Sequence, residues 1–268
     1  MRAAKNSRPQ PRQLSPTLFG YDRPLDIPRS ISIAIPAYNE EKRLPKTLDS
    51  ILAYLAQRDF SPVEILVVDD GSTDGTAALV KAYGDRDSRI RLLRNPGNRG
   101  KGYSVRHGML EAKGDWVLFS DADLSAPIED LDLLLAAAVK ADAAVAIGSR
   151  AVDRSMVGVH QSLWRETSGR AFNLLMRVAN GLPFGDTQCG FKLYRRIAAQ
   201  AVFSRQTLEG FSFDVEDLVI AKHLGLRTIE VAVHWNNVEG TTVGTLQGLK
   251  SFADLLRIRA RQMLGRYR

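Results

Sequence analysis

Apolar runs of strand length alternate with amphipathic segments through most of this chain. The runs are rich in Ile, Val and Leu, and they occupy residues 31–35, 63–68, 90–93, 114–120, 143–147 and 227–235. The remaining segments repeat their apolar residues at three- and four-residue spacing, which predicts helices. These helices are expected at residues 41–56, 72–83, 102–112, 128–141, 161–180, 213–224 and 245–264. Alternating strands and helices favour an α/β fold with a doubly wound, mostly parallel sheet flanked by helices.

The two ends of the chain differ from this α/β body. Residues 1–29 combine five prolines with scattered arginines and no apolar period, so we expect a disordered basic tail there. Residues 30–244 then form the α/β domain, and residues 245–268 form a basic amphipathic helix that could anchor the protein at a membrane surface. The predicted apolar face of that helix consists of Leu246, Leu249, Ala253, Leu256, Ala260 and Met263.

The net charge of +7 lies at these two ends. Residues 1–30 carry +4 and residues 245–268 carry +5, so the body between them carries −2. A basic chain suggests nucleic-acid binding, but the body that would bear the binding surface is slightly acidic. We therefore expect no nucleic-acid partner, and an anionic membrane surface suits the basic ends at least as well.

Cysteine content and hydropathy indicate the compartment. Cys189 is the one cysteine, which excludes an internal disulfide and a cysteine-based metal site and suggests a reducing environment. The longest apolar run, residues 133–139, is far shorter than the roughly 20 residues that span a bilayer. We expect a cytoplasmic protein that is peripheral on the cytoplasmic face of the membrane, on its own or through a membrane protein partner.

Acidic side chains follow three of the predicted strands. Asp121 and Asp123 follow the strand at 114–120, Glu40 follows the strand at 31–35, and Asp69 and Asp70 follow the strand at 63–68. Ligands of open α/β sheets bind at the carboxyl ends of strands. Two neighbouring carboxylates suit Mg²⁺ or Mn²⁺ bound against a diphosphate, although such a pair can also be a solvated loop or a helix cap.

Five short motifs give the chain a family resemblance. In order they are Pro-Ala-Tyr-Asn-Glu (36–40), Val-Asp-Asp-Gly-Ser-Thr-Asp-Gly-Thr (68–76), Asn-Arg-Gly-Lys-Gly (98–102), Asp-Ala-Asp (121–123) and Gly-Ser-Arg (148–150). In this order and spacing they resemble the family 2 glycosyltransferases, which have the GT-A fold. Two further strings, at 186–192 and 213–216, resemble the dolichyl-phosphate glucosyltransferases, with the mannosyltransferases close behind.

The resemblance implies a metal-dependent, inverting transfer of a sugar from a nucleotide sugar to a polyprenyl phosphate. It favours UDP-glucose as the donor, with GDP-mannose as the alternative. Pro36, Tyr38 and Glu40 would line the base and ribose, and Asp69 or Asp70 would accept a hydrogen bond from the base or the ribose. Asp121, Ala122 and Asp123 would complete the nucleotide-sugar site, with the two aspartates holding Mg²⁺ or Mn²⁺.

Three other residues are implied in the reaction. Arg150 would contact the donor phosphate, Arg165 would bind the acceptor phosphate, and Asp214 would orient the sugar or act as a base. The chain also departs from its relatives, because Ser125 stands where mannosyl relatives often have Gln. In addition, residues 240–242 lack the lysine of a common Gly-Ser-Lys string. A third metal ligand and a phosphate contact therefore stay open.

Two alternatives remain at this point. A family 2 enzyme with a hydroxyl acceptor, such as a growing polysaccharide, would need Asp214 as its base. A non-catalytic membrane or nucleic-acid binding protein would need neither carboxylate pair. The helices at 161–180 and 245–264 can lie in a lipid interface or pack on the sheet.

Overall fold

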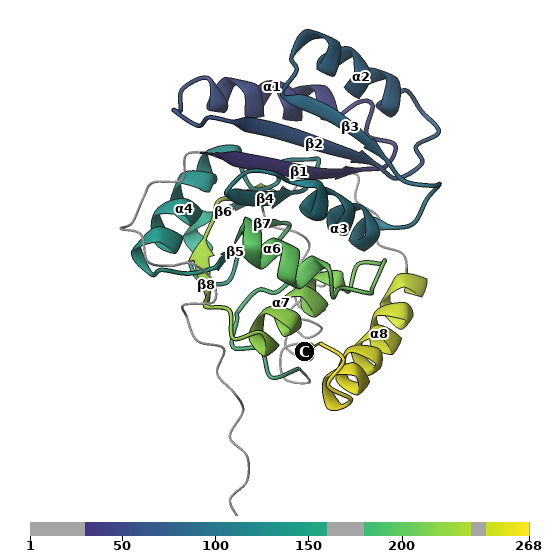
Figure 1. Cartoon of the computed structure of the whole chain (residues 1–268), viewed down its shortest axis with the longest axis vertical. Coiled ribbons are helices and arrows are strands. Elements are labelled where there is room, and N and C mark those ends of the chain that lie inside the picture. Colours follow the sequence, from purple (N-terminus) through teal and green to yellow (C-terminus); the bar gives the residue numbers. More distant parts are fainter. Residues whose placement is uncertain (1–29, 160–179, 237–244, 268) are drawn as a thin grey trace, which may run out of the picture.

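The computed structural model describes residues 30–159, 180–236 and 245–267, with the side chains of 245–252 left out (Figure 1). Three predicted features lie outside these residues: the tail at 1–29, the helix at 161–180 that carries Arg165, and the loop at 240–242.

A seven-stranded sheet forms the centre of the described structure, in the order β3-β2-β1-β4-β7-β5-β8. Its strands are β1 (Ile31–Ala37), β2 (Val63–Asp69), β3 (Ile90–Arg94), β4 (Trp116–Ser120), β5 (Val145–Ser149), β7 (Phe191–Arg195) and β8 (Thr228–Ala232). All neighbours pair in parallel except β7, which is antiparallel to both β4 and β5. The structure confirms a mostly parallel α/β sheet.

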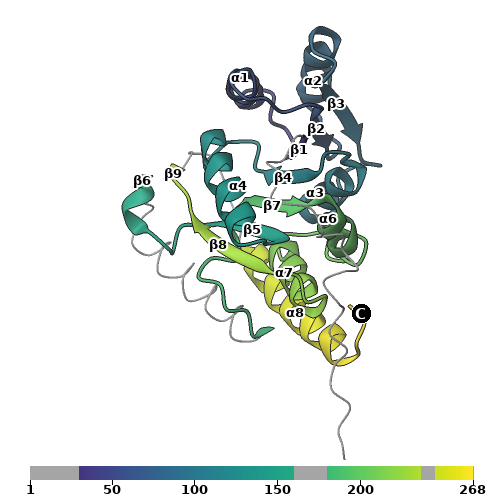
Figure 2. The ribbon, with the colours of Figure 1, turned by 60° about the vertical axis from the view of Figure 1, so that its left-hand side comes forward.

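The central strands are apolar throughout because helices cover both faces of the sheet. Alternate residues of a strand point to opposite faces, so Ile33 and Ile35 of β1 enter one core while Ala34 enters the other. Helices α1 (Leu44–Leu55), α2 (Thr76–Arg86) and α4 (Leu131–Lys140) supply the first core. The second core is covered by α3 (Lys101–Glu111), α6 (Arg196–Phe203), α7 (Phe213–His223) and α8 (Thr245–Met263) (Figures 1 and 2).

Three elements were not expected from the sequence. Helix α6 follows β7 directly, and two short strands, β6 (Val157–Val159) and β9 (Trp235–Asn236), form a small parallel sheet of their own. The run predicted as one strand at 227–235 is split between β8 and β9. Each of these elements is short, so its apolar residues are too few to show a period.

Helix α2 begins at Thr76, four residues after the predicted start at Ser72. The Asp74 carboxylate accepts hydrogen bonds from the backbone and hydroxyl of Thr76, at 3.0 and 2.5 Å. Asp74 therefore caps the helix from outside. Residues 72–75 form the turn that joins β2 to α2, and its first two residues, Ser72 and Thr73, contact the site described below.

The end of the chain packs against α7. Tyr267 is fully buried, and its hydroxyl donates a hydrogen bond of 2.8 Å to Glu216 Oε1. Leu255 and Ile258 of α8 enter the same core. Within the described ranges, no helix has the length and apolar character required to cross a membrane.

Tyr267→Phe is expected to lower the free energy of unfolding by about 2 kcal/mol, because it removes a buried hydrogen bond to a carboxyl group. Equilibrium unfolding in urea measures the change. Tyr83→Phe is the matched control, since the Tyr83 hydroxyl donates 2.9 Å to the exposed Asp49 carboxylate. We expect the control to change stability by less than about 0.5 kcal/mol. Equal losses in the two variants would contradict this role of Tyr267.

Candidate active site

The end of β4 carries the two neighbouring aspartates in a fixed backbone. The Asp121 amide donates to the Gly190 carbonyl at 3.0 Å, and the Ala122 carbonyl accepts from Thr47 Oγ1 at 2.6 Å. Asp123 Oδ1 accepts from the Ser125 amide at 3.0 Å. Both carboxylates are thus held in place at the carboxyl end of β4, as the sequence predicts.

A lysine lies against the first of these aspartates. Lys101 Nζ is 2.7 Å from Asp121 Oδ1, and it also lies over the rings of Phe119 and Phe211. Burial raises the pKa of Asp121, and Lys101 opposes this effect. Burial disfavours the Lys101 ammonium, but the nearby Asp121 and Asp214 carboxylates raise its pKa above the ordinary value. The carboxylates of Asp121 and Asp214 therefore favour the charged form of Lys101 in spite of its burial.

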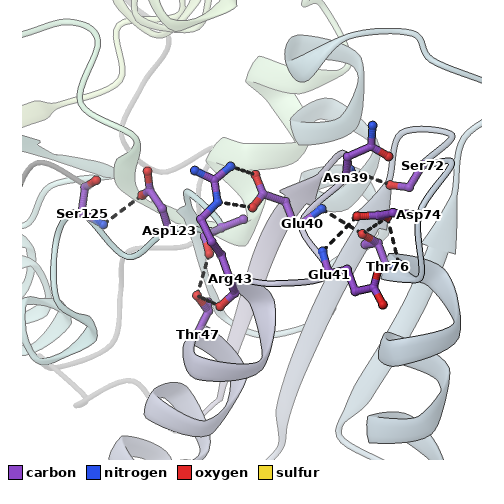
Figure 3. A network of polar contacts seen from close by, with 11 residues as sticks. Asn39, Glu40, Glu41, Arg43, Thr47, Ser72, Asp74, Thr76, Asp123 and Ser125 are labelled. Carbon is purple, nitrogen blue, oxygen red and sulfur yellow. Dashed lines mark hydrogen bonds and ion pairs between the residues drawn. The ribbon is translucent and has the colours of Figure 1, made fainter. Parts of the chain in front are cut away.

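The segment after β1 approaches the same place. Tyr38 is exposed over 46% of its surface, and Pro36 pairs with Val68 just before β1 ends at Ala37. Both oxygens of Glu40 accept from Arg43, at 2.6 Å each (Figure 3). Burial raises the pKa of Glu40 against the effect of Arg43, and the charge of Asp123 adds to the rise. Arg43 thus stands between Glu40 and the β4 aspartates.

Two loops of the site are joined to each other by hydrogen bonds (Figure 3). The amide of Asn39 donates to Ser72 Oγ at 3.0 Å, and its side-chain oxygen accepts from the Thr73 amide at 2.9 Å. The Glu40 amide donates to Thr76 Oγ1 at 2.8 Å. Asn39 has a φ of 55°, a conformation that asparagine tolerates better than most residues. Hydrogen bonds therefore join the loop after β1 to the loop after β2.

Both carboxylate oxygens of Asp70 accept hydrogen bonds from the segment that leads to α3, including its glycine-rich turn. Its carboxylate accepts from Asn95 Nδ2 at 2.8 Å, from the Arg99 amide at 2.9 Å and from the Gly100 amide at 2.7 Å. Gly100 has a φ of 103°, which a residue with a side chain rarely adopts. Asp70 therefore fixes the backbone that delivers Lys101.

Asp69 differs from its neighbour, because one of its oxygens has no hydrogen-bond partner. Oδ1 accepts from the Ser72 amide at 3.0 Å. Oδ2 is buried without a hydrogen bond, and Arg94 Nε lies 3.6 Å from it. Of the two acids named from the sequence, Asp69 is the one that keeps an acceptor for a ligand.

Arg150 lies beyond the end of β5 and is held on two sides. Its Nε and Nη2 donate to the Asp186 carboxylate at 2.6 and 2.9 Å, and its guanidinium lies 4.7 Å from the centre of the Trp235 ring. Glu230 fixes Asp186 in turn by accepting from its amide at 2.7 Å. Although burial disfavours the Asp186 carboxylate, Arg150 holds its pKa below the ordinary value. Nη1 of Arg150 makes no hydrogen bond to the described residues, so this donor is left for a ligand.

Asp214 lies at the start of α7, close enough to Asp121 and Lys101 to affect their pKa values. Lys192 Nζ lies 2.7 Å from its Oδ1. Glu216, two residues on, caps a loop instead, because its carboxylate accepts from the amides of Thr207 and Leu208. Asp214 is therefore near the β4 aspartates, whereas the carboxylate of Glu216 is bound to the loop at Thr207 and Leu208.

The side chains of the β4 aspartates fit a divalent cation. Both are hard oxygen donors, and Oδ2 of Asp123 makes no hydrogen bond to the described residues. Oδ1 of Asp121 already contacts one cation, the Lys101 ammonium. No cluster of three or more His, Cys, Asp or Glu side chains suitable for a metal occurs in residues 30–159, 180–236 and 245–267. Two protein ligands therefore leave most positions of such an ion for phosphate oxygens and water.

Comparison with known proteins gives this arrangement a family. The model of the family described as Glycosyl transferase family 2 matches residues 32–203. This chain belongs to that family. The match begins in β1 and ends in α6, so it contains both loops and the β4 aspartates.

Curated relatives of this family 2 glycosyltransferase share one name. A dolichyl-phosphate beta-glucosyltransferase from Trichomonas vaginalis is 39% identical over 236 residues, which cover 85% of this chain and 72% of that protein. The proteins of that name from Drosophila melanogaster and Homo sapiens are 37% and 34% identical, over 89% and 90% of this chain and 77% and 78% of theirs.

Solved structures show the fold of the family 2 domain. Glucosyl-3-phosphoglycerate synthase from Mycobacterium tuberculosis in complex with phosphoglyceric acid has a TM-score of 0.66 at 21% identity, over 87% of this chain and 80% of that chain. The same enzyme in complex with Mn²⁺, UDP-glucose and phosphoglyceric acid has a TM-score of 0.65 at 22% identity, with the same coverage. These matches confirm the expected GT-A fold.

Several residues of the glycosyltransferase site were not singled out from the sequence. Arg43 stands three residues after Glu40 in the turn before α1, and this short separation of opposite charges was the available signal. Lys101 belongs to the glycine-rich motif at 98–102, where a lysine can contact a phosphate or be solvated, so the sequence did not predict its contact with Asp121. Gly190 and Lys192 lie in the string at 186–192, but neither of them was assigned a contact from the sequence. Gly190 meets Asp121 through the antiparallel pairing of β7 with β4, and Lys192 meets Asp214 and Asp217 of α7.

Proposed function

We propose that this glycosyltransferase moves glucose from UDP-glucose to a polyprenyl phosphate and inverts the anomeric centre. The observation that carries the proposal is the pair Asp121 and Asp123 at the carboxyl end of β4, beside Lys101 and near the charge of Asp214. The acceptor and the sugar are supported by the relatives at 34–39% identity that are named dolichyl-phosphate beta-glucosyltransferases.

Asp121 and Asp123 would hold Mg²⁺ or Mn²⁺ through carboxylate oxygens. Such an ion, when bound, supplies positive charge to the diphosphate and stabilises the departing nucleotide. The structural neighbour with Mn²⁺ and UDP-glucose supports a divalent cofactor. Lys101 would give up or share its contact with Asp121 as the phosphates enter.

The remaining donor contacts come from the first two loops. Asp69 Oδ2 would accept a hydrogen bond from the base or the ribose, since it is buried and accepts no hydrogen bond, whereas both oxygens of Asp70 do. Tyr38 is exposed for stacking on the base, and Pro36 and Glu40 shape the edge of the same site. These contacts would place the diphosphate toward the end of β4.

In the proposed reaction, a phosphate oxygen of the acceptor attacks the anomeric carbon as the bond from that carbon to the diphosphate oxygen breaks. The electron pair of the broken bond leaves with UDP, and Arg150 would stabilise the added charge through its remaining donors. Arg165 would bind the acceptor phosphate. A phosphate is largely ionised near pH 7, with a second pKa of about 6, so Asp214 would orient the sugar rather than take a proton.

Helix α8 offers an apolar stripe for the membrane that carries the acceptor. Leu255 and Ile258 face the protein, but Leu256 and Met263 are 74% and 75% exposed. Ala253 and Ala260 are exposed as well, so the described part of the apolar face predicted from the sequence does not pack on the protein. This stripe is flanked by exposed arginines at 257 and 259, an arrangement that suits an anionic lipid surface, and we place the enzyme at the cytoplasmic face.

Leu256→Glu combined with Met263→Glu is expected to weaken binding to vesicles of phosphatidylcholine and phosphatidylglycerol by at least about tenfold, because two apolar side chains leave the interface. Vesicle co-sedimentation measures this. The matched control changes two exposed apolar residues outside the stripe, Leu133 and Ile197, to Glu. If the control lowers vesicle binding equally, the net charge of the protein and not the apolar stripe determines binding.

A donor screen tests the proposed function. The purified chain is mixed with a short polyprenyl phosphate and either UDP-glucose or GDP-mannose, with Mn²⁺, with Mg²⁺ or with EDTA. We expect a glucosylated lipid phosphate from UDP-glucose with metal, and none after Asp121→Asn or Asp123→Asn. Transfer from GDP-mannose alone would overturn the donor, and transfer only to hydroxyl acceptors would overturn the acceptor.

A further inference from the structure

A lysine ammonium lies in the core beneath the proposed site. Lys192 is 0% exposed and stands in β7, the strand that lies between β4 and β5 in the sheet. A buried ammonium is strongly unfavourable unless charged and polar groups pair with it. Its partners come from the first two turns of α7, so the lysine joins the sheet to the start of that helix.

The contacts to Asp214 are made at two atoms of the same residue. Lys192 Nζ lies 2.7 Å from Asp214 Oδ1 and 3.0 Å from the Asp214 backbone carbonyl. One contact fixes the side-chain rotamer and the other fixes the backbone from which it extends. Asp214 is therefore held more tightly than a single ion pair would hold it.

The second partner, Asp217, belongs to the core. It is fully buried, lies 3.2 Å from Lys192 Nζ and accepts from the Tyr194 hydroxyl at 2.8 Å. Burial raises the pKa of Asp217 to about 7, and the Asp214 carboxylate adds to this rise while Lys192 opposes it. One ammonium thus serves two carboxyl groups, of which Asp214 alone is close to Asp121 and Lys101.

We propose that Lys192 is a positioning residue, which fixes Asp214 through Oδ1 and the backbone carbonyl so that Oδ2 is directed to the donor sugar. The inference rests on the proposed role of Asp214 in orienting that sugar. Lys192 itself does not contact the substrate. Lys192 is paired with Phe119 of β4, so it links Asp214 to the strand that carries the β4 aspartates, which would hold the other end of the donor.

Removal of the lysine alone would confound two effects. Lys192→Met leaves two carboxyl groups buried without a cation, which is strongly destabilising. The double variant Lys192→Met with Asp217→Asn removes one of those charges, so its melting temperature should return toward that of the wild type. Asp217→Asn alone is the matched control, because it disturbs the same cluster but keeps the Lys192 to Asp214 pair.

The experiment measures kcat, donor KM, melting temperature and the crystal structure of the wild type and the three variants. We expect the double variant to fold and to keep its donor KM within about threefold, but to lose about a hundredfold in kcat, as misplacement of a catalytic group by about 1 Å can cause. Its crystal structure should show the Asp214 carboxylate displaced. Asp217→Asn should keep kcat within about threefold of the wild type.

Two outcomes would overturn the inference: a kcat that recovers together with stability in the double variant, or an unmoved Asp214 in its crystal structure. Failure of the proposed function is seen separately, because the wild type would then give no glucosylated lipid phosphate. In that case, kcat of the variants and of the wild type is measured with the donor that the wild type does use. The position of Asp214 in the crystal structures then tests the inference independently of any activity assay.

Discussion

Gly190→Ala is expected to lower glycosyl transfer by at least about a hundredfold while the protein stays folded. A β-carbon at this position would overlap Asp121 Oδ2 and lie 2.7 Å from Oδ1. The Gly190 backbone is outside the positive-φ region, so alanine fits the chain itself. The flexible carboxylate must therefore swing away, and the cost falls on the proposed metal and diphosphate site. Transfer rates and melting temperature measure the two effects.

Gly75→Ala is the matched control for this substitution. Its β-carbon would lie 2.5 Å from Glu41 Oε1, so it too displaces a carboxylate, at a position outside the proposed donor contacts. We expect this control to keep transfer within about threefold of the wild type, since exposed changes usually have small effects. A Gly190→Ala variant with full activity would show that the Asp121 position observed here is not the one used in transfer.

The strand ends of the site could be predicted from the sequence because local patterns encode them. Apolar runs that are buried on both faces identify β1, β2 and β4 without knowledge of their partners. An acid directly after such a run then lies at a carboxyl end, whatever the order of the strands. This reasoning placed Glu40, Asp69 and Asp121 correctly at one edge of the sheet.

The supports of the site could not be predicted, because they depend on strand order. β7 lies between β4 and β5 and is antiparallel to both, and its own residues do not indicate that direction. Three residues in β7 and in the segment just before it support residues of the site. Asp186 binds Arg150, Gly190 makes room for Asp121, and Lys192 binds Asp214; none of these three contacts was identified from the sequence.

The roles of neighbouring acids also required the structure. Asp69 and Asp70 are adjacent and chemically identical, and the sequence left either one as the acceptor for the donor nucleotide. Hydrogen bonds from Asn95 and from the amides at 99 and 100, about thirty positions away, occupy Asp70. Such contacts are long-range in sequence, so no local pattern distinguishes the pair.

Arg150→Lys is expected to lower kcat by about a hundredfold to a thousandfold, the range found when one preorganised donor to a developing negative charge is lost. The guanidinium binds both Asp186 oxygens, at 2.6 and 2.9 Å, lies on Trp235 and still has Nη1 for a phosphate oxygen. A lysine ammonium is a single point charge without a planar face. It can keep the ion pair with Asp186 or reach the diphosphate, but it cannot do both. Steady-state transfer assays measure the loss.

Arg195→Lys is the matched control, because Arg195 is also placed between a carboxylate and a tryptophan ring. It lies 2.9 Å from Asp142 and 5.1 Å from the centre of the Trp116 ring, at the edge of the sheet opposite the site. Since this arrangement has no ligand to serve, we expect kcat within about twofold of the wild type. If both lysine variants lose activity alike, Arg150 acts by stabilising the fold, and the charge that develops on the leaving diphosphate must be stabilised elsewhere.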